Sequence, residues 1–316
     1  MERQSKIFVA GDRTLIGGAI LRVLRRQHFE NILGADGSGP DLLDAGDVED
    51  FFERTRPEYV FLAAGKSAGI AGNQKYPADL IRENLFIECH VIHSAYVHGV
   101  KKLLYLASSC CYPRHCPQPM KVESLLTGPL EPTNEAYAIA RIAGIKLCEA
   151  YRRQYGVPFI AGIPADAFGP GAHFSLEDSH VVAALIRKMH EAKVNRIDTV
   201  EIWGTGNPRR EFVFADDLAD ACTFVMQHYE GAETLNLGGG SDMSIRELAM
   251  AVQEVTGYTG TLSYDTSRPD GMPFKALDAS VLLGIGWLPK TPFRAALQQT
   301  YQWFLQSQSE LQPSKV

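Results

Sequence analysis

Short apolar runs alternate with amphipathic stretches through the first half of the chain. Apolar runs of four or five residues favour buried strands, whereas apolar positions three or four residues apart favour helices. Five runs are predicted as strands: residues 6–10, 31–35, 59–63, 103–107 and 159–163. The predicted helices lie between them, at residues 17–26, 47–55, 77–97 and 134–155. This alternation predicts a parallel sheet, with ligands bound beyond the carboxyl ends of its strands.

The second half has shorter elements, separated by Gly and Pro. The predicted helices are residues 179–192, 218–229, 245–256 and 292–306, and the predicted strands are residues 200–203, 212–214 and 234–237. The fold class predicted is α/β: a Rossmann-like, doubly wound parallel sheet with a smaller C-terminal α/β substrate-binding lobe. We expect residues 1–170 to form a dinucleotide-binding domain, with elements contributed from 195–240, and residues 171–316 to form mainly the substrate-binding lobe.

A glycine-containing turn follows the first predicted strand. It reads Gly11-Asp12-Arg13-Thr14-Leu15-Ile16-Gly17, and Gly17 opens a helix. Backbone N–H groups and the helix dipole at such a turn favour a pyrophosphate. Thr14 stands where a middle glycine is expected, and its Cβ predicts a tighter or shifted fit. We expect all seven residues to contact a dinucleotide.

The type of dinucleotide depends on two residues with opposite charges. Arg13 can pair with a 2′-phosphate, which favours NADP(H), whereas Asp36 can accept a hydrogen bond from a ribose 2′-OH, which favours NAD(H). Asp36 can equally be a solvated turn residue. Asp44 can reach an adenine edge or cap the next helix. We expect NADP(H) as the cofactor, with NAD(H) as the alternative.

Charge and composition narrow the function further. The formal net charge is −6, the pI is about 5.9 and no long basic run is present, so neither nucleic acid nor a membrane is an expected partner. The first apolar run spans only residues 7–10, which favours a cytoplasmic protein. The six Cys residues lack metal-ligand spacing, so no metal site is predicted. Helices 77–97 and 134–155 carry apolar residues on more than one face, which favours a homodimer.

A possible catalytic pair lies in one of these long helices. Tyr137 and Arg141 are four residues apart, so both lie on one helix face. A cation so placed stabilises a phenolate and helps the tyrosine to protonate a carbonyl oxygen. Ser108, roughly 30 residues upstream, offers a hydroxyl that can hold the same oxygen. The pattern predicts a carbonyl-reducing site, although the usual cation at this spacing is Lys.

Longer segments around these residues resemble a known family. The segments are residues 108–113, 130–140, 142–149, 179–181 and 203–212. They resemble the extended short-chain dehydrogenase/reductase superfamily and, more closely, the GDP-L-fucose synthase family, over nearly the whole chain. This resemblance implies NAD(P)H-dependent reduction of the C4 ketone of a GDP-4-keto-6-deoxy sugar, or of a related GDP-4-keto sugar. It also implies epimerisation at C3 and C5, within nucleotide-sugar biosynthesis.

The resemblance also implies roles for individual residues. Cys110 and His180 match the family's base and acid for epimerisation, beside the reducing group of Ser108, Tyr137 and Arg141. Further cofactor contacts are expected from Leu106, Ala107, Ser109, Pro164, Ala165, Asp166 and Ala167. Contacts with the GDP-linked sugar are expected from Lys188, Trp203, Arg210, Asp270 and Lys275, the last at the diphosphate. Without the resemblance, Cys110 would be interpreted as a core residue, His180 as a surface residue and residues 209–211 as a surface salt-bridge cluster.

Four residues depart from the family pattern. Arg141 replaces Lys, Thr14 replaces Gly, Asp166 replaces Asn and Lys188 replaces Arg. Arginine keeps the positive charge but relays protons poorly, and Asp166 would oppose a phenolate if it lay close to Tyr137. These departures leave open an epimerase-only or reductase-only variant acting on a GDP-heptose or another GDP-4-keto sugar. They also leave open a non-catalytic dinucleotide sensor.

Overall fold

The computed structural model describes residues 1–175, 179–268, 270 and 272–311. Within them, six parallel strands form the central sheet in the order β2-β1-β3-β4-β5-β9. The strands are β1 (Ile7–Ala10), β2 (Ile32–Leu33), β3 (Tyr59–Leu62), β4 (Lys102–Leu106), β5 (Phe159–Pro164) and β9 (Leu235–Leu237). The chain passes from β1 to β2 and then returns to the other side of β1, so the winding reverses between β1 and β3. Doubly wound sheets bind ligands at such a switch point, and the predicted fold class is confirmed.

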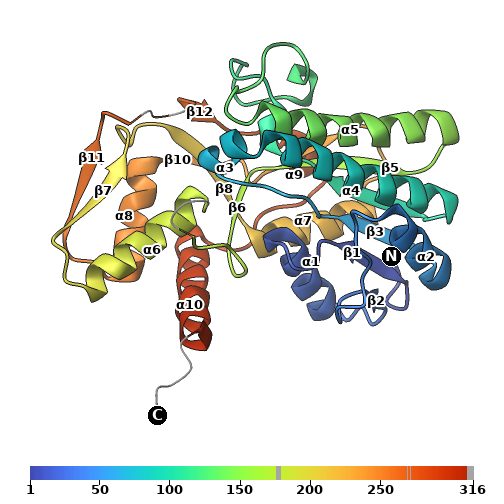
Figure 1. The fold of residues 1–316 in the computed structure, drawn as a ribbon, viewed down its shortest axis with the longest axis horizontal. Helices are drawn as coiled ribbons and strands as arrows, with labels where there is room; N and C mark the ends of the chain where they lie inside the picture. Colours follow the sequence, from blue (N-terminus) through green and yellow to red (C-terminus); the bar gives the residue numbers. More distant parts are fainter. Residues whose placement is uncertain (176–178, 269, 271, 312–316) are drawn as a thin grey trace.

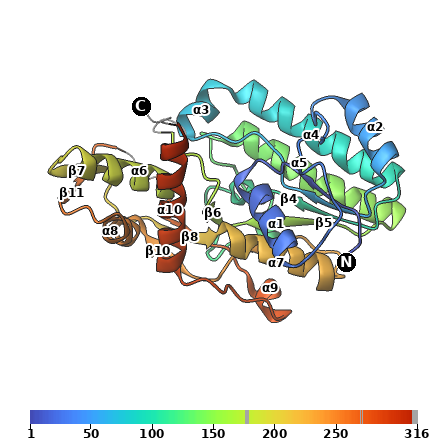
Figure 2. The ribbon, with the colours of Figure 1, turned by 90° about the horizontal axis from the view of Figure 1, so that it is seen from below.

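Helices cover both faces of this sheet (Figure 1; Figure 2). One face carries α2 (Ala45–Thr55), α4 (Pro77–Val97) and α5 (Glu135–Tyr155); the other carries α1 (Leu15–Arg26) and α7 (Ala215–His228). α4 packs along α5, and α1 packs along α7. The strands between these layers are apolar, and every residue of β1 and β5 is buried. Among the described helices, none has the length and apolar composition needed to cross a lipid bilayer.

A second group of elements surrounds β8 (Arg209–Phe214). β10 pairs with β8 in antiparallel fashion, whereas β12 and β6 pair in parallel with successive stretches of it. β7 and β11 form a separate parallel pair. These strands and their helices are β6 (Asp166–Phe168), β7 (Thr199–Trp203), β10 (Asp242–Ser244), β11 (Thr261–Asp265), β12 (Phe274–Lys275), α6 (Val181–Val194), α8 (Ile245–Thr256) and α10 (Phe293–Leu311). Their hydrophobic core includes Phe168, Ile186 and Leu248. The boundary at residue 170 stays a prediction.

Several short elements were not predicted from the sequence. They are β6, β10, β11, β12, α3 (Ile70–Lys75), α9 (Ser280–Gly284) and two 3-10 helices, Ser109–Cys111 and Val122–Ser124. Strands of two or three residues are too short to show an alternating pattern, and β11 has no buried residue to mark it. The predicted strand 31–35 is shorter than expected, because Gly34 has a φ of +77° and leaves the extended conformation.

Asn236, in the middle of β9, holds two long connections against the sheet. Its Nδ2 donates to the carbonyl of Met120 at 2.8 Å and to that of Asp278 at 3.0 Å. Its Oδ1 accepts a hydrogen bond from the Tyr112 hydroxyl at 2.5 Å. Met120 belongs to the connection that follows β4, and Asp278 lies between β12 and α9. One buried amide therefore fixes the two segments that carry candidate site residues on β12 and after β4.

We expect Asn236→Ala to lower the free energy of unfolding by roughly 2 kcal/mol or more, because three polar groups lose a buried partner. Urea denaturation of the purified protein measures the change. Asn195→Ala, at the exposed end of α6, is the control and should change stability by less than about 0.5 kcal/mol. Equal effects of the two substitutions would contradict this account of Asn236.

Candidate active site

The turn after β1 is built around backbone that a side chain would obstruct. Gly11 has a φ of +92°, and a Cβ there would lie 2.6 Å from Cα of Ala64. A Cβ on Gly17 would lie 1.9 Å from the Gly11 carbonyl oxygen. Thr14 is the N-cap of α1: its hydroxyl donates to the Gly11 carbonyl at 2.8 Å and accepts from the Gly17 N–H at 3.0 Å. The threonine therefore stabilises the turn from within, and the two glycines let the turn pack closely on itself and on the end of β3. The N-terminus of α1 that follows is the part that suits a pyrophosphate.

The remaining residues of the turn lie along its rim. Asp12, Leu15 and Ile16 are half-buried, and Arg13 is exposed. The Arg13 guanidinium reaches the loop after β2, where its Nη2 would be 3.5 Å from a Cβ placed on Gly37. This position brings a cation to the loop where the 2′ substituent of an adenosine ribose is bound in doubly wound folds.

Asp36 and Asp44 both have local structural partners. Asp36 Oδ1 accepts hydrogen bonds from the Ser38 N–H at 3.1 Å and from its hydroxyl at 2.6 Å, and the side-chain bond is the main reason that the Asp36 pKa is lowered. Asp44 accepts from the Asp47 N–H at 2.9 Å and caps α2. The structure thus shows the turn role of Asp36 and the capping role of Asp44, the second alternative considered for each residue.

Two other predicted cofactor segments end neighbouring strands. Leu106 and Ala107 are buried at the end of β4, and the Ala107 N–H donates to the carbonyl of Gly162 on β5 at 2.8 Å. Pro164 ends β5 and Ala165 follows it, and both are buried. Ala167, on β6, is half-buried. The carboxyl ends of β1, β4 and β5 therefore present these segments at one edge of the sheet.

The loop after β4 brings Cys110 next to the start of α5. Ser108 ends the extended chain, and its Oγ accepts a hydrogen bond from the Cys110 N–H at 3.2 Å. Cys110 Sγ accepts from Nδ2 of Asn134, the residue before α5, at 3.2 Å. The adjacent Cys111 thiol donates to the Ala138 carbonyl at 3.9 Å and so fixes the loop against the first turn of α5. Cys111 is buried, and burial raises the pKa of its thiol, whereas Cys110 is half-buried and is the more accessible thiol of the two.

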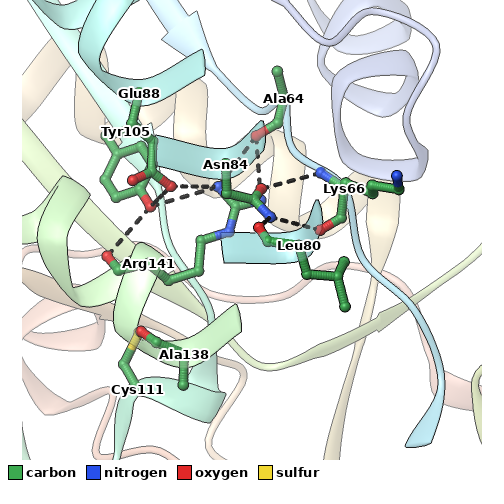
Figure 3. Close-up of polar contacts among 9 residues, drawn as sticks. All are labelled: Ala64, Lys66, Leu80, Asn84, Glu88, Tyr105, Cys111, Ala138 and Arg141. Atoms are coloured by element: carbon green, nitrogen blue, oxygen red, sulfur yellow. Dashed lines mark hydrogen bonds and ion pairs between the residues drawn. The ribbon is translucent and has the colours of Figure 1, made fainter. Parts of the chain in front are cut away.

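Arg141 points from α5 towards the sheet and α4 (Figure 3). Its guanidinium carbon lies 5.2 Å from the centroid of the Tyr137 ring. Nη1 donates to Glu88 Oε1 at 3.1 Å, and both Nη atoms donate to the Ala64 carbonyl at 3.2 Å. The hydroxyl of Tyr105 donates to the same Glu88 oxygen at 2.7 Å. Arg141 therefore contacts the face of the tyrosine ring while its hydrogen bonds go elsewhere.

Burial controls the protonation of Glu88 and Tyr105, the two side chains bonded to Arg141. It raises the pKa of Glu88 to about 7, against the opposing effect of Arg141, and it also raises the pKa of Tyr105. Burial works against the charge of Arg141, but Tyr137, Tyr105 and Glu88 together raise its pKa. The guanidinium thus stays positive, while Glu88 changes its protonation near neutral pH.

A second charged group lies where β6 and β12 meet along β8. Lys275 Nζ lies 2.9 Å from Asp166 Oδ1, and the Ser109 hydroxyl lies 3.5 Å from the same oxygen. Burial opposes the charge of Asp166, but Lys275, His180 and Arg210 lower its pKa. Burial likewise opposes the charge of Lys275, and Asp166 raises its pKa. The Asp166 carboxylate is therefore paired with Lys275. Its effect on Tyr137, which was expected only if the two side chains lay close together, stays a prediction. His180 is exposed and directly precedes α6.

The outer end of the candidate site holds an exposed indole between two cations. Trp203 is 60% exposed, with Lys188 Nζ 5.3 Å and Arg268 Cζ 5.0 Å from its ring centroid. Asp270 accepts hydrogen bonds from the Thr205 N–H at 2.6 Å and from its hydroxyl at 2.8 Å. An aromatic surface beside cations suits a nucleotide base and its phosphates.

Residues 209–211 do not form one surface cluster. Arg209 forms an ion pair with Asp242 at the surface. Glu211 is buried and accepts the N–H of Leu277 at 2.7 Å. Arg210 lies between them, and burial lowers its pKa. The salt-bridge alternative thus holds for Arg209 and is wrong for the other two residues.

Comparison with known proteins gives the family. The model of the NAD dependent epimerase/dehydratase family matches residues 7–238. GDP-L-fucose synthase 1 of Arabidopsis thaliana is 52% identical over 306 residues, covering 97% of this chain and 95% of that protein. GDP-L-fucose synthase of Escherichia coli is 44% identical, covering 96% of this chain and 98% of its own. This chain belongs to the GDP-L-fucose synthase group of that family.

Solved structures agree with this assignment. The GDP-L-fucose synthetase of Naegleria fowleri bound to NADP has a TM-score of 0.90 and 26% identity, and covers 98% of this chain and 96% of its own. The GDP-mannoheptose C4 reductase MlghC of Campylobacter jejuni, with NADP bound, has a TM-score of 0.88 and 34% identity, and covers 96% and 99%. The chain is thus an enzyme of this epimerase and reductase family, and the sensor alternative is wrong.

Several residues of this GDP-L-fucose synthase relative had no role in the sequence prediction. Asn134 contacts Cys110, Arg268 contacts Trp203, and Glu88 contacts Arg141. The one available signal for Glu88 was a carboxylate among the apolar positions of helix 77–97, which is unusual unless it is paired. The roles of the predicted site residues remain proposals.

We expect Thr14→Ala to lower the free energy of unfolding by about 1 kcal/mol, because the Gly17 N–H loses its N-cap partner. Thr14→Ser keeps the hydroxyl and is the matched control. Urea denaturation distinguishes the two variants. A Thr14→Ala protein as stable as the serine variant would show that the hydroxyl does not cap α1.

Proposed function

We propose that this enzyme reduces the C4 ketone of a GDP-4-keto-6-deoxy sugar with NADP(H) and epimerises C3 and C5 in the same pocket. The observation that carries the proposal is the contact between the loop after β4 and the start of α5. That contact places the Cys110 thiol, through Asn134, beside the helix turn that carries Tyr137. The names of the relatives supply the substrate class, as GDP-linked sugars.

The reduction adds a hydride to the carbon of the C4 carbonyl and a proton to its oxygen. NADPH, when bound at the turn after β1, supplies the hydride. Tyr137 donates its hydroxyl proton to the C4 oxygen, and Ser108 holds that oxygen by a hydrogen bond. Arg141 contributes a fixed positive charge against the tyrosine ring, which favours loss of the proton.

The epimerisation uses the same ketone. Each C–H bond at C3 and C5 is acidic because its carbanion is an enolate of the C4 ketone. Cys110 removes a proton, and His180 delivers one on the opposite face. Lys275, paired with Asp166, brings a positive charge to this part of the site. Both reactions then share one set of positioned groups.

A reductase-only enzyme on a GDP-heptose is the second candidate. It is favoured by the likeness to the GDP-mannoheptose C4 reductase, which covers 96% of this chain. An epimerase with little reduction is favoured by a different observation, since the Arg141 hydrogen bonds go to Glu88 and Ala64. Deuterium incorporation and cofactor oxidation separate these candidates.

Two further features belong to the proposal. We infer NADP(H) from the position of Arg13 beside the loop after β2, while the Asp36 carboxylate is engaged by Ser38. We also infer a cytoplasmic homodimer that associates through α4 and α5. Exposed apolar residues on these helices support the dimer: Phe86, Val97, Ile139 and Tyr155.

We expect Tyr137→Phe to lower NADPH oxidation by at least about 100-fold, because the general acid is lost, while deuterium from solvent still enters C3 and C5. Cys110→Ser should stop the entry of deuterium at C3 and C5, while NADPH oxidation continues. Cys116→Ser and Tyr76→Phe, outside the site, are the controls. The assay combines cofactor absorbance with mass spectrometry of the sugar. Absence of cofactor oxidation by the wild-type enzyme with any GDP-4-keto sugar would overturn the proposal.

We expect Arg13→Ala to raise the KM for NADPH by about tenfold, since a charge-assisted hydrogen bond to the 2′-phosphate is lost. The KM for NADH should change by less than about twofold. Arg25→Ala, exposed at the far end of α1, controls for the loss of one charge. Steady-state kinetics with both cofactors gives the comparison, and equal effects on both would contradict a 2′-phosphate contact.

A further inference from the structure

The guanidinium of Arg141 occupies space that exists because residue 65 has no side chain. A Cβ on Gly65 would lie 1.7 Å from Nη2 of Arg141 and 2.6 Å from its Cζ. Gly65 also has a φ of +151°, which L residues rarely adopt. The preceding carbonyl, that of Ala64, accepts both Nη atoms. The backbone after β3 therefore forms one wall of a site shaped for a guanidinium.

Helix α4 provides the opposite wall. Asn84 and Glu88 are four residues apart, so they share one helix face, and both are buried (Figure 3). Asn84 holds the loop: its Oδ1 accepts the Lys66 N–H at 3.0 Å, and its Nδ2 donates to the Lys66 carbonyl at 2.9 Å. Glu88 holds Arg141 itself at 3.1 Å. One face of α4 thus fixes both the loop and the cation.

We propose that Glu88 is a positioning residue for the reduction, which holds Arg141 against the Tyr137 ring in a site opened by Gly65. The inference rests on the proposed function, because it concerns the tyrosine that protonates the sugar. Glu88 controls the position of the guanidinium and also how much of its charge remains uncompensated. Gly65 makes the replacement of the usual Lys by Arg sterically possible.

The charge argument depends on what surrounds Glu88. The titratable groups that face it in the described residues are Arg141 and Cys148 from α5, Tyr105 from β4, Cys111 from the 3-10 helix and Cys89 on its own helix. Burial raises the pKa of each of these thiols, so Arg141 is the charged neighbour. Burial raises the pKa of Glu88 to about 7, so it is mostly ionised at pH 8 and above. There it compensates Arg141 and weakens the stabilisation of a phenolate.

The test compares pH–rate profiles of NADPH oxidation for the full-length enzyme. In Glu88→Gln the guanidinium is uncompensated, so the alkaline limb, where the tyrosine loses its proton, should move about one pH unit lower. Glu49→Gln removes a carboxylate that also has two side-chain partners, Ser94 and His98, and should leave the limb in place. Tyr105→Phe removes a hydrogen bond to Glu88 but no charge. It should lower stability and leave the alkaline limb unchanged. If the role of Glu88 were merely structural, Glu88→Gln would give this same result.

A second readout needs no substrate. Tyrosinate absorbance is titrated in the wild type and in Glu88→Gln, each with and without Tyr137→Phe, so that the difference reports Tyr137 alone. The Tyr137 signal should move to lower pH in Glu88→Gln. If the wild type turns over no GDP-4-keto sugar, the proposed function fails while this titration still decides the role of Glu88. An unchanged titration and an unchanged limb would overturn the inference.

The fit between Gly65 and Arg141 is tested by a double-mutant cycle on Tm. Arg141→Lys should lower Tm in the wild type, because the lysine side chain is one bond shorter and its ammonium falls short of the position of Nη1, which bonds both Glu88 and the Ala64 carbonyl. It should raise Tm in the Gly65→Ala background, since it removes the two arginine atoms that clash with the new Cβ. The backbone strain at residue 65 and the contact of that Cβ with Asn84 Oδ1, at 2.6 Å, are common to both Gly65→Ala variants and cancel. The same change in both backgrounds would overturn the steric part. If neither Gly65→Ala variant folds, the Glu88→Gln titration decides the proposal.

Discussion

A guanidinium buried beside the sheet needs hydrogen-bond partners where it lies, and this requirement links α5 to the rest of the molecule. A guanidinium without partners in that position would cost several kcal/mol. The partners of Arg141 come from three separate elements: Glu88 on α4, Tyr105 on β4 and the Ala64 carbonyl after β3. Because these partners are fixed in the core, α5 is held in one position. The ring of Tyr137, one turn earlier, is therefore held at the carboxyl edge of the sheet.

The replacement of Lys by Arg is therefore part of a larger arrangement and not an isolated change. Arginine needs a second hydrogen-bond acceptor, more space and a carboxylate within reach. The Ala64 carbonyl is the second acceptor, and Glu88 is the carboxylate. The space is available because Gly65 has no side chain. Thr14 is a similar case in the turn after β1. It stands where a glycine was expected, and its hydroxyl caps α1.

The sequence predicted what depends on local pattern. Buried strands, long helices and the Gly11 turn have strong local signals, and Tyr137 and Arg141 share a face because they lie one turn apart. Glu88 could not be assigned, since its contact with Arg141 spans 53 residues of sequence and no spacing rule joins them. The same holds for Asp166 and Lys275, which are 109 residues apart and meet only because β6 and β12 pair with successive parts of β8.

That second pair also explains how the pocket accepts an extra carboxylate. Asp166 is paired with Lys275, and Arg210 also lowers its pKa, so the added carboxylate is balanced by cations of the same site. A nucleotide diphosphate carries two negative charges and needs cations that are not already neutralised. Lys275 is committed to Asp166, so we infer that Arg210 and the cations around Trp203 are left for the diphosphate. We infer that Lys275 instead acts beside Asp166 and Ser109, near the loop that carries Cys110.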